Sequence, residues 1–389
     1  MNYVSKEKLK KLFYFLNEKN EFYSQLFERN KIDLNNDLFE ELMKLPIMEK
    51  ETIRYNLDTY YSKTNEEIKI ERTSGSVGIP LICKKSKSER ANAAINVWEK
   101  RRRIDKEISP QNYFHFFGNS KGQIGDFINV NQEQLINFFN NILKRKYRWI
   151  SGPVSTILAI AKLLEKQLVK NDCIKFVELF GEYCSKEQRN YIEKMFDCKT
   201  VVHYGTRETW CIAYECEHRK LHIQDNLFYV EIKANKGEKS GEIVVTSYYN
   251  KVMPFVRYNL KDIGYIEETQ CKCGSKSPCL YLQGGRTADM IYGYNLLGNN
   301  FFNRVINQVF EEGYDSIDKF KVIQVERNLF IMYIVKGKNY SNSIENIIIS
   351  TTREKLGEQI TINFIYVSDL KFEASGKFKN FECQLNECN

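Results

Sequence analysis

The chain contains 389 residues, which at roughly 150 residues per domain predicts about 2.6 domains, or one large domain with a smaller one. Its composition, 42% hydrophobic and 28% charged with 6 Pro and 20 Gly, excludes collagen, Pro/Gly-rich linker proteins and wholesale disorder. The formal net charge of +8 is a mild excess, which fits anionic small ligands as well as anionic polymers.

The N-terminus and the cysteines bear on the cellular compartment. The first 20 residues contain no uninterrupted apolar run of the kind that secretory leaders carry. The longest apolar stretch, Val154–Leu164, has about half of the ~20 residues that a membrane-spanning helix needs. The cysteines number 11, which is odd. We therefore expect a soluble cytoplasmic protein without a membrane partner, whose thiols are reduced or bound to metal.

The N-terminal third is predicted to begin with helices and to continue into strands. Apolar residues recur near helical spacing over residues 1–45, with Lys and Glu between them. Leu45-Pro46 marks a break, and Lys50 begins a further helix. Residues 68–83 then have the pattern of a strand, a loop of small residues and a second strand.

A helix predicted over Ser86–Arg103 ends in three consecutive arginines. Arg101, Arg102 and Arg103 could mark a nucleic-acid-binding surface. We favour a solvated helix end, because basic side chains interact well with the C-terminal end of the helix dipole. Since no recognised nucleic-acid-binding module accompanies the arginines, we expect no nucleic-acid partner.

The rest of the chain divides into three regions that differ in their predicted pattern of helices and strands. Residues 109–200 alternate short aromatic or β-branched runs with helical patterns, which indicates an α/β sheet with a strong parallel component. From about residue 201 the pattern is strand-rich, which predicts a partly antiparallel lobe. After Arg286 helices alternate again with strands. These later elements are a helix at 301–311, strands near 319–336, a helix at 341–356 and a strand at 360–366.

The predicted fold class is therefore α/β and α+β, in two domains. Residues 1–285 form the large N-terminal domain, with parallel-rich sheets and a β-rich lobe. Residues 286–389 form a small, mobile α+β C-terminal domain.

A loop of hydroxyls and glycines lies between the strands of residues 68–83. Such a loop exposes backbone N–H groups and short O–H donors to an anion. It lacks the P-loop pattern, and taken alone it could be an ordinary turn. The candidate anion-binding residues are Thr73, Ser74, Gly75, Ser76 and Gly78.

Further candidates for nucleotide chemistry follow predicted strands. In Tyr204–Glu208 a tyrosine can stack on a base, a glycine allows close backbone approach, and Glu208 can hold Mg²⁺. Asp262 can bind a diol such as ribose, or cap a turn. Arg286 lies where the strand-rich region ends and helices again alternate with strands. Lys377 lies on a late loop from which it can reach another domain.

Together these segments resemble, in residue type and order, the adenylate-forming acyl ligases. The similarity is to the branch of phenylacetate–CoA ligase and the CapK proteins, and it extends from about residue 45 to about residue 380. The matching segments are Thr73–Pro80, Tyr204–Glu208, Arg257–Asp262, Gly285–Ile291 and Ser375–Lys377.

The resemblance implies a two-step reaction. A carboxylate attacks the α-phosphorus of ATP to give acyl-AMP and pyrophosphate, and a thiol of CoA or of a carrier protein then displaces AMP. The loop at 73–78 would cradle the β- and γ-phosphates, and Glu208 would hold Mg²⁺. Lys377 would stabilise the α-phosphate when the small domain moves in.

The resemblance also assigns the nucleoside contacts. Tyr204 would stack on adenine near Gly181 and Glu182, and Asp262 would accept the ribose hydroxyls. Arg286 would lie near the ribose or the phosphates. The nucleotide-binding set also includes Gly205 and Thr206.

Three of the departures from the family pattern leave other functions open. Val77 replaces a hydroxyl residue, Lys261 replaces a glycine, and Ala288 replaces a polar residue. A second hypothesis is therefore a nucleotide-binding or partner-binding protein that has lost catalysis. A third possibility is transfer of the acyl group to an amine.

Two turns in the strand-rich lobe carry candidate zinc ligands. Cys216 and His222 flank one charged turn, and Cys271 and Cys273 lie in a Gly/Ser loop. Two ligand pairs, each in a turn, are typical of a closed tetrahedral Zn²⁺ site with a structural role. The branch that the chain resembles often has Cys and His at these positions, and some of its members bind structural zinc there. Further possible ligands are Cys211, Cys279 and His218, and the alternative is a set of reduced cysteines.

Overall fold

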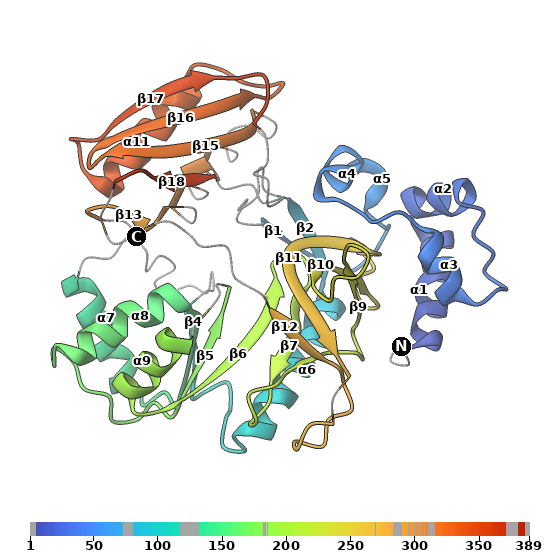
Figure 1. The fold of residues 1–389 in the computed structure, drawn as a ribbon, viewed down its shortest axis with the longest axis horizontal. Helices are drawn as coiled ribbons and strands as arrows, with labels where there is room; N and C mark the ends of the chain where they lie inside the picture. The colour runs from blue at the N-terminus through green and yellow to red at the C-terminus, as the bar shows by residue number, and fades with distance from the viewer. Residues whose placement is uncertain are drawn as a thin grey trace. The chain divides into compact units, whose positions relative to one another are not determined.

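The computed structural model describes the chain apart from several segments. These are residues 1–4, 73–80, 117–131, 182–183, 185, 269, 283–289, 295, 299–300, 303–304, 307, 310–315, 371–379 and 386–389. The chain forms two compact units, drawn in Figure 1. Unit 1 comprises Met1–Glu71 and Cys83–Gly285, and unit 2 comprises Arg72–Ile82 and Arg286–Asn389.

The N-terminal region is helical as predicted, but it consists of separate short helices. They are α1 (Lys6–Lys19), α2 (Glu21–Arg29), α3 (Leu38–Lys44), α4 (Lys50–Tyr55) and α5 (Leu57–Tyr60). Asn20 separates the first two, because its side chain accepts a hydrogen bond from the Tyr23 amide and so begins a new helix. The same buried side chain donates to the Tyr60 carbonyl at 2.8 Å, which fixes α2 to α5.

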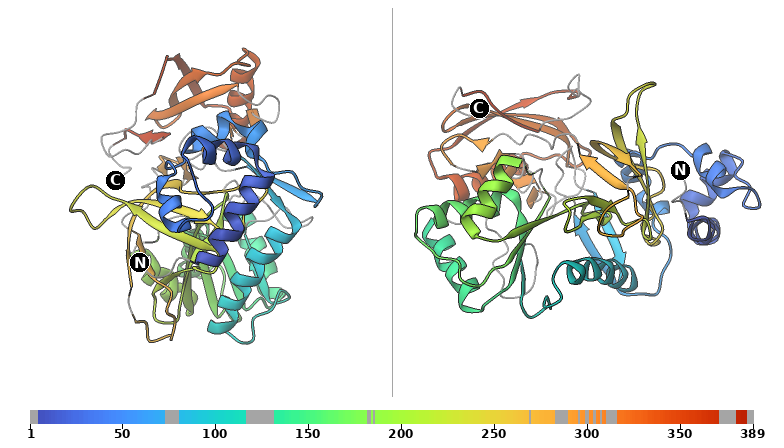
Figure 2. Two further views of the ribbon diagram at one scale, coloured as in Figure 1. Left: turned by 90° about the vertical axis from the view of Figure 1, so that its right-hand side faces the viewer. Right: turned by 60° about the horizontal axis from the view of Figure 1, so that its bottom comes forward.

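A single ten-stranded sheet forms the centre of unit 1, in the order β3-β4-β5-β6-β7-β8-β12-β11-β10-β9. Figure 1 labels most of its strands, and Figure 2 gives two further views of the ribbon. The strands β3 to β6 are parallel, and β6 to β12 pair antiparallel. The predicted parallel-rich and antiparallel regions are thus confirmed, but they form one continuous sheet rather than a sheet with a separate lobe. The strand bounds are β3 (Tyr113–His115), β4 (Trp149–Pro153), β5 (Phe176–Phe180), β6 (Lys199–Thr206), β7 (Trp210–Glu215), β8 (Leu221–Ile223), β9 (Phe228–Lys233), β10 (Gly241–Ser247), β11 (Tyr258–Glu267) and β12 (Cys279–Leu282).

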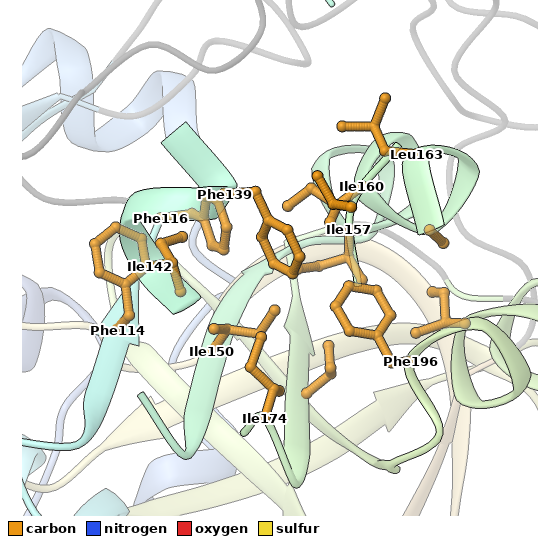
Figure 3. Close-up of a cluster of buried hydrophobic side chains, with 14 of the residues drawn as sticks. Phe114, Phe116, Phe139, Ile142, Ile150, Ile157, Ile160, Leu163, Ile174 and Phe196 are labelled. Carbon is orange, nitrogen blue, oxygen red and sulfur yellow. The ribbon is translucent and has the colours of Figure 1, made fainter. Parts of the chain in front are cut away.

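Helices cover both faces of the parallel part of the sheet. On one face α7 (Gln132–Lys144), α8 (Val154–Glu165) and α9 (Lys186–Phe196) pack against strand residues such as Ile150 (Figure 3). The opposite face carries the alternate residues, including Trp149, and packs against α6 (Lys87–Ile104). Two covered faces are what parallel strands require.

Helix α6 occurs where the sequence predicts it, but the assignment of its last turn to solvent is wrong for one arginine. Arg101 is only 7% exposed and donates to the Glu178 carboxylate from Nε at 3.2 Å and from Nη2 at 2.7 Å. Arg102 and Arg103 are exposed, as expected. Helical spacing turns Arg101 toward the sheet, where a buried carboxylate is its partner.

Unit 2 contains a four-stranded sheet in the order β17-β16-β15-β18 with one long helix, which confirms the predicted α+β region. Its elements are β15 (Ile317–Glu326), β16 (Leu329–Lys336), α11 (Ser343–Leu356), β17 (Thr361–Tyr366) and β18 (Phe381–Cys383), with a small pair β13 (Met290–Ile291) and β14 (Leu296–Leu297). Phe302, Ile334 and Ile348 lie in its buried core. Part of the predicted helix 301–311 lies outside the described residues.

Two further findings concern the compartment. Among the helices in the described ranges, none is long and apolar enough to cross a membrane. Cys383 is disulfide-bonded, so the prediction that every cysteine outside the metal cluster is a reduced thiol is wrong for this residue. Counting cysteines along a chain cannot reveal which of them pair.

Candidate functional site

The Tyr204–Glu208 segment spans the end of β6 and the first residues of the loop that leads to β7. At Gly205 a Cβ atom would lie 1.8 Å from the Trp210 carbonyl oxygen, so only glycine fits this position. The Thr206 hydroxyl accepts a hydrogen bond from the Thr209 amide at 3.2 Å. Both residues therefore shape the loop itself, in addition to any contact with a nucleotide.

Two of the predicted nucleoside-binding residues are in direct contact. The Tyr204 hydroxyl donates to Oδ2 of Asp262 at 2.7 Å, across 58 positions of sequence. Tyr204 belongs to β6 and Asp262 to β11. The fold thus places side by side the tyrosine and the carboxylate that the resemblance assigns to adenine and ribose.

Glu208 lies in a buried part of the same loop. Its side chain accepts a hydrogen bond from the Tyr258 hydroxyl at 3.1 Å, and the residue is 8% exposed. Burial raises the pKa of the Cys83 thiol, and the nearby Glu208 charge raises it further. Burial, followed by the charge of Glu208, also raises the pKa of Tyr258 well above its ordinary value. A carboxylate held by a hydroxyl donor suits a magnesium ligand, because Mg²⁺ in nucleotide sites takes one or two carboxylates beside the phosphates.

Gly181 follows directly after β5 and has φ of +75°. No atom lies within 4 Å of the position of an added Cβ, so the requirement for glycine here is conformational. The other predicted site residues lie outside the described parts of the chain. They are Thr73, Ser74, Gly75, Ser76, Gly78, Glu182, Arg286 and Lys377.

Lys261 stands one residue before Asp262, where the related family has glycine. Its φ is +60°, which explains why glycine suits the position. Its Nζ lies 2.9 Å from Glu49 and 3.5 Å from Glu242, so the lysine is engaged in surface ion pairs. The structure therefore favours a surface lysine over a charge directed at a nucleotide.

We expect Lys261→Gly to be more stable than Lys261→Ala by about 1 kcal/mol, because both lose the ion pairs but only alanine keeps the strained left-handed backbone. Urea unfolding of the two variants measures the difference. Equal stability, or a more stable alanine variant, would show that backbone strain at residue 261 is negligible.

Sequence reasoning missed a buried polar network beneath the parallel strands. Glu178, fully buried in β5, accepts hydrogen bonds from Arg101, from Tyr113 at 2.9 Å and from Tyr214 at 2.7 Å. Burial raises the pKa of the Glu178 carboxyl, but the charge of Arg101 outweighs it, and the pKa lies well below its ordinary value. Glu178 is therefore a buried, ionised carboxylate in the middle of β5 that accepts hydrogen bonds from three other elements.

Two histidines near Glu178 stack on the ring of Phe180. The rings of His115 and His203 lie on either side of Phe180, each with its centroid 5.1 Å from the phenylalanine centroid. His203 Nδ1 is 3.5 Å from Glu178. Burial lowers the pKa of His115 to about 4, so its imidazole is neutral at neutral pH. The available signals were an acid inside an apolar strand, a histidine at the end of β3 and a histidine within β6.

The four predicted zinc ligands converge. The donor atoms of Cys216, His222, Cys271 and Cys273 all lie within 4.8 Å of one another. The Sγ atoms of Cys216 and Cys271 are 3.7 Å apart, and Cys273 Sγ lies 3.4 Å from His222 Nε2. Tetrahedral zinc with Zn–S bonds of about 2.3 Å separates its sulfurs by about 3.8 Å, so the cluster has suitable dimensions.

The histidine in this cluster is also correctly oriented. His222 Nδ1 lies 2.9 Å from the Ser277 carbonyl oxygen, which can only accept, so Nδ1 carries the proton and donates. The lone pair is then on Nε2, the atom that faces Cys273. The alternative ligands are placed differently: Cys211 contacts the Ala213 carbonyl, and Cys279 lies 3.7 Å from Nδ1.

Comparisons with known sequences agree with the resemblance. Residues 297–381 match the family model of the CapK C-terminal domain. Over 400 aligned residues the chain is 20% identical to Protein CapK of Staphylococcus aureus, and the alignment covers 96% of this chain and 82% of that protein.

Solved structures share the fold. A crystal structure of 2-hydroxyisobutyryl-CoA ligase with 2-HIB-AMP and CoA in the thioesterification state matches with a TM-score of 0.64 at 14% identity, covering 97% of this chain and 89% of that one. An open conformation of the same ligase matches with a TM-score of 0.61 at 14% identity, covering 96% and 90%. The predicted resemblance to adenylate-forming ligases and their CapK-like branch is thereby confirmed, and the fold is that of these enzymes.

Proposed function

We propose that the protein catalyses the ATP-dependent adenylation of a carboxylic acid, releasing pyrophosphate, and then transfers the acyl group to a thiol. The observation that supports this most strongly is the contact between Tyr204 and Asp262, 2.7 Å apart. It joins the two segments assigned to adenine and ribose, in a fold shared with a ligase captured with an acyl-AMP and CoA.

The proposed first step needs charge stabilisation more than proton transfer. The carboxylate oxygen attacks the α-phosphorus, the bond to the β-phosphate oxygen breaks, and pyrophosphate leaves with its electron pair. Glu208 would hold Mg²⁺, which when bound neutralises charge on the phosphates. The loop at 73–78 would donate to the β- and γ-phosphates, and Lys377, from a C-terminal domain of residues 286–389, would approach the α-phosphate.

The nucleoside would be held chiefly by Tyr204 and Asp262, which belong to unit 1. Tyr204 offers a flat face for adenine, with its hydroxyl fixed by Asp262. Asp262 would accept the ribose hydroxyls. Arg286 would lie near the ribose or phosphates, and Gly181 and Glu182 would lie near the base.

The thiol acceptor is proposed to be CoA or a carrier protein. CoA is present in the structure of the ligase that shares the fold. Like ATP it is a polyanion, and this is consistent with the net charge of +8. Transfer to an amine remains the alternative acceptor chemistry.

We also propose that the cluster of Cys216, His222, Cys271 and Cys273 holds a structural Zn²⁺ ion. The supporting observations are the convergence of four donors within 4.8 Å and the Nδ1–H of His222 donating to the Ser277 carbonyl. Three thiolates and one imidazole fill a tetrahedron and leave no position for a substrate. Its contribution would be to hold two turns of the antiparallel region together.

The test of the proposed function is ATP–pyrophosphate exchange against a broad panel of carboxylic acids. We expect at least one acid to support exchange that requires Mg²⁺ and both substrates. Its product should be acyl-AMP, with a thioester formed on addition of CoA. Tight ATP binding without exchange for any acid would contradict the enzyme and favour a non-catalytic nucleotide-binding protein.

A further inference from the structure

Lys85 is a buried lysine in β2 (Ile82–Ser86), only 1% exposed. Its Nζ donates to Glu71 Oε2 at 2.8 Å and to the Arg207 carbonyl at 2.5 Å. The Trp210 indole N–H also donates to Glu71 Oε2, at 3.2 Å, and its ring centroid lies 5.3 Å from Nζ. Removing a lysine charge from water is costly, so a fully engaged buried lysine has a specific task.

The partners of Lys85 come from two parts of the chain that bear on nucleotide binding. Glu71 lies in β1 (Ile68–Arg72), so Glu71 and Lys85 flank the 73–80 segment, whose ends are the pairing strands β1 and β2. Arg207 lies within the Tyr204–Glu208 segment, and Trp210 begins β7. Lys85 therefore connects the strands that flank the predicted phosphate loop to the predicted magnesium loop. It does so through its ion pair with Glu71 and its hydrogen bond to the Arg207 carbonyl.

A second buried residue of β2 lies on the same face of the strand as Lys85. Cys83 lies two residues before Lys85, so both side chains are on one face of the strand, and both are buried. Glu208 acts electrostatically on the Cys83 thiol, raising its pKa in the same direction as burial does. Lys85 thus holds Arg207, the residue next to Glu208, by its main-chain carbonyl.

The Glu71 carboxyl is ionised in the folded protein. Burial raises the pKa of the Glu71 carboxyl, but the charge and hydrogen bond of Lys85 outweigh this and bring the pKa to about 2. Glu71 also has an exposed partner, since Lys69 Nζ lies 3.2 Å from its Oε1 and the Lys69 side chain is 50% exposed. Lys69 contacts the other oxygen of the same carboxylate, and so provides a matched control.

We propose that Lys85 is a positioning residue for ATP, which sets the place of the Tyr204–Glu208 loop through the Arg207 carbonyl and the Glu71 carboxylate. This inference rests on the proposed adenylation function. An apolar side chain could fill the same volume, and buried ion pairs are often replaceable in that way without loss of stability. No apolar side chain can donate a hydrogen bond to the Arg207 carbonyl. This hydrogen bond is therefore the property that distinguishes Lys85 from an apolar residue of the same size.

The experiment measures exchange kinetics of Lys85→Met in the full chain at varied ATP. We expect the KM for ATP to rise at least about tenfold, because misplacing a binding group by a fraction of an ångström has effects of this size. Hydrogen exchange of the peptide covering residues 204–210 should become faster. Lys69→Met should leave both quantities unchanged within about twofold, since its ion pair is exposed.

The double variant Lys85→Met/Glu71→Leu separates positioning from stability. It removes both buried charges, so its thermal stability should recover toward that of the parent. The high KM for ATP and the fast exchange at 204–210 should remain, because the donor to the Arg207 carbonyl is still absent. A double variant with the parent KM would overturn the proposal and leave Lys85 a stability residue.

The outcome for the parent protein distinguishes this inference from the proposed function. If the parent exchanges ATP with pyrophosphate and Lys85→Met has the same KM and the same hydrogen exchange at 204–210, the positioning role is wrong and the adenylation function stands. If the parent neither binds ATP nor supports exchange, the adenylation function fails, and the role for ATP fails with it.

Discussion

Replacing Lys377 with alanine is expected to reduce ATP–pyrophosphate exchange at least about 100-fold, which is the usual effect of losing one donor that stabilises developing oxyanion charge. The reason is chemical. When the carboxylate attacks the α-phosphorus, negative charge grows on the phosphate oxygens, and a cation that meets it there acts in the transition state. The affinity for ATP in the ground state should change much less, because most phosphate contacts come from other residues.

The measurement compares exchange rate, ATP dissociation constant and melting temperature for Lys377→Ala and for a control. Lys338→Ala is the control, since Lys338 is an exposed lysine of the same unit. We expect the control to match the parent in all three quantities. A Lys377→Ala variant that keeps the parental exchange rate would remove this lysine from the reaction and with it the assignment of the Ser375–Lys377 segment.

The order of strands and helices in this chain is readable from its sequence. The alternation of strands and helices over residues 109–200 predicted parallel strands, and the order of short motifs predicted the ligase fold. The contact between Tyr204 and Asp262 follows from that fold, although 58 positions separate the two residues. Periodicity and motif order carry such information because they report which faces are buried and which loops stand at strand ends.

The same reasoning fails where a charge is buried by tertiary structure. Arg101 was assigned to a solvated helix end, yet it pairs with Glu178 inside the fold. Lys85 and Glu71 lie in an ordinary charged strand sequence, and only the sheet shows that they meet below the Arg207 loop. Burial of a single charged residue depends on a partner distant in sequence, and local composition does not contain that partner.

The zinc cluster gives the second large expected effect. Replacing Cys271 or Cys273 with serine should lower bound zinc from about one equivalent to under about a tenth after extensive dialysis, because each supplies one of four ligands. The turns that carry Cys216 and Cys271 would lose their common anchor. We expect the melting temperature to fall by at least about 5 °C, which corresponds to a loss of roughly 2 kcal/mol in a domain of this size.

Cys279→Ala tests which atoms bind the metal. Cys279 lies 3.7 Å from His222 Nδ1, on the nitrogen that donates to Ser277, whereas the cluster uses Nε2. The alanine variant should therefore keep its full zinc content, and Cys173→Ser, a half-buried cysteine outside the cluster, should keep it as well. Because the coordination is closed, exchange activity per folded molecule should be the same in all variants that remain folded.

Zinc below about a tenth of an equivalent in the parent protein would contradict the metal assignment. The cluster would then consist of three ordinary reduced cysteines and a hydrogen-bonded histidine.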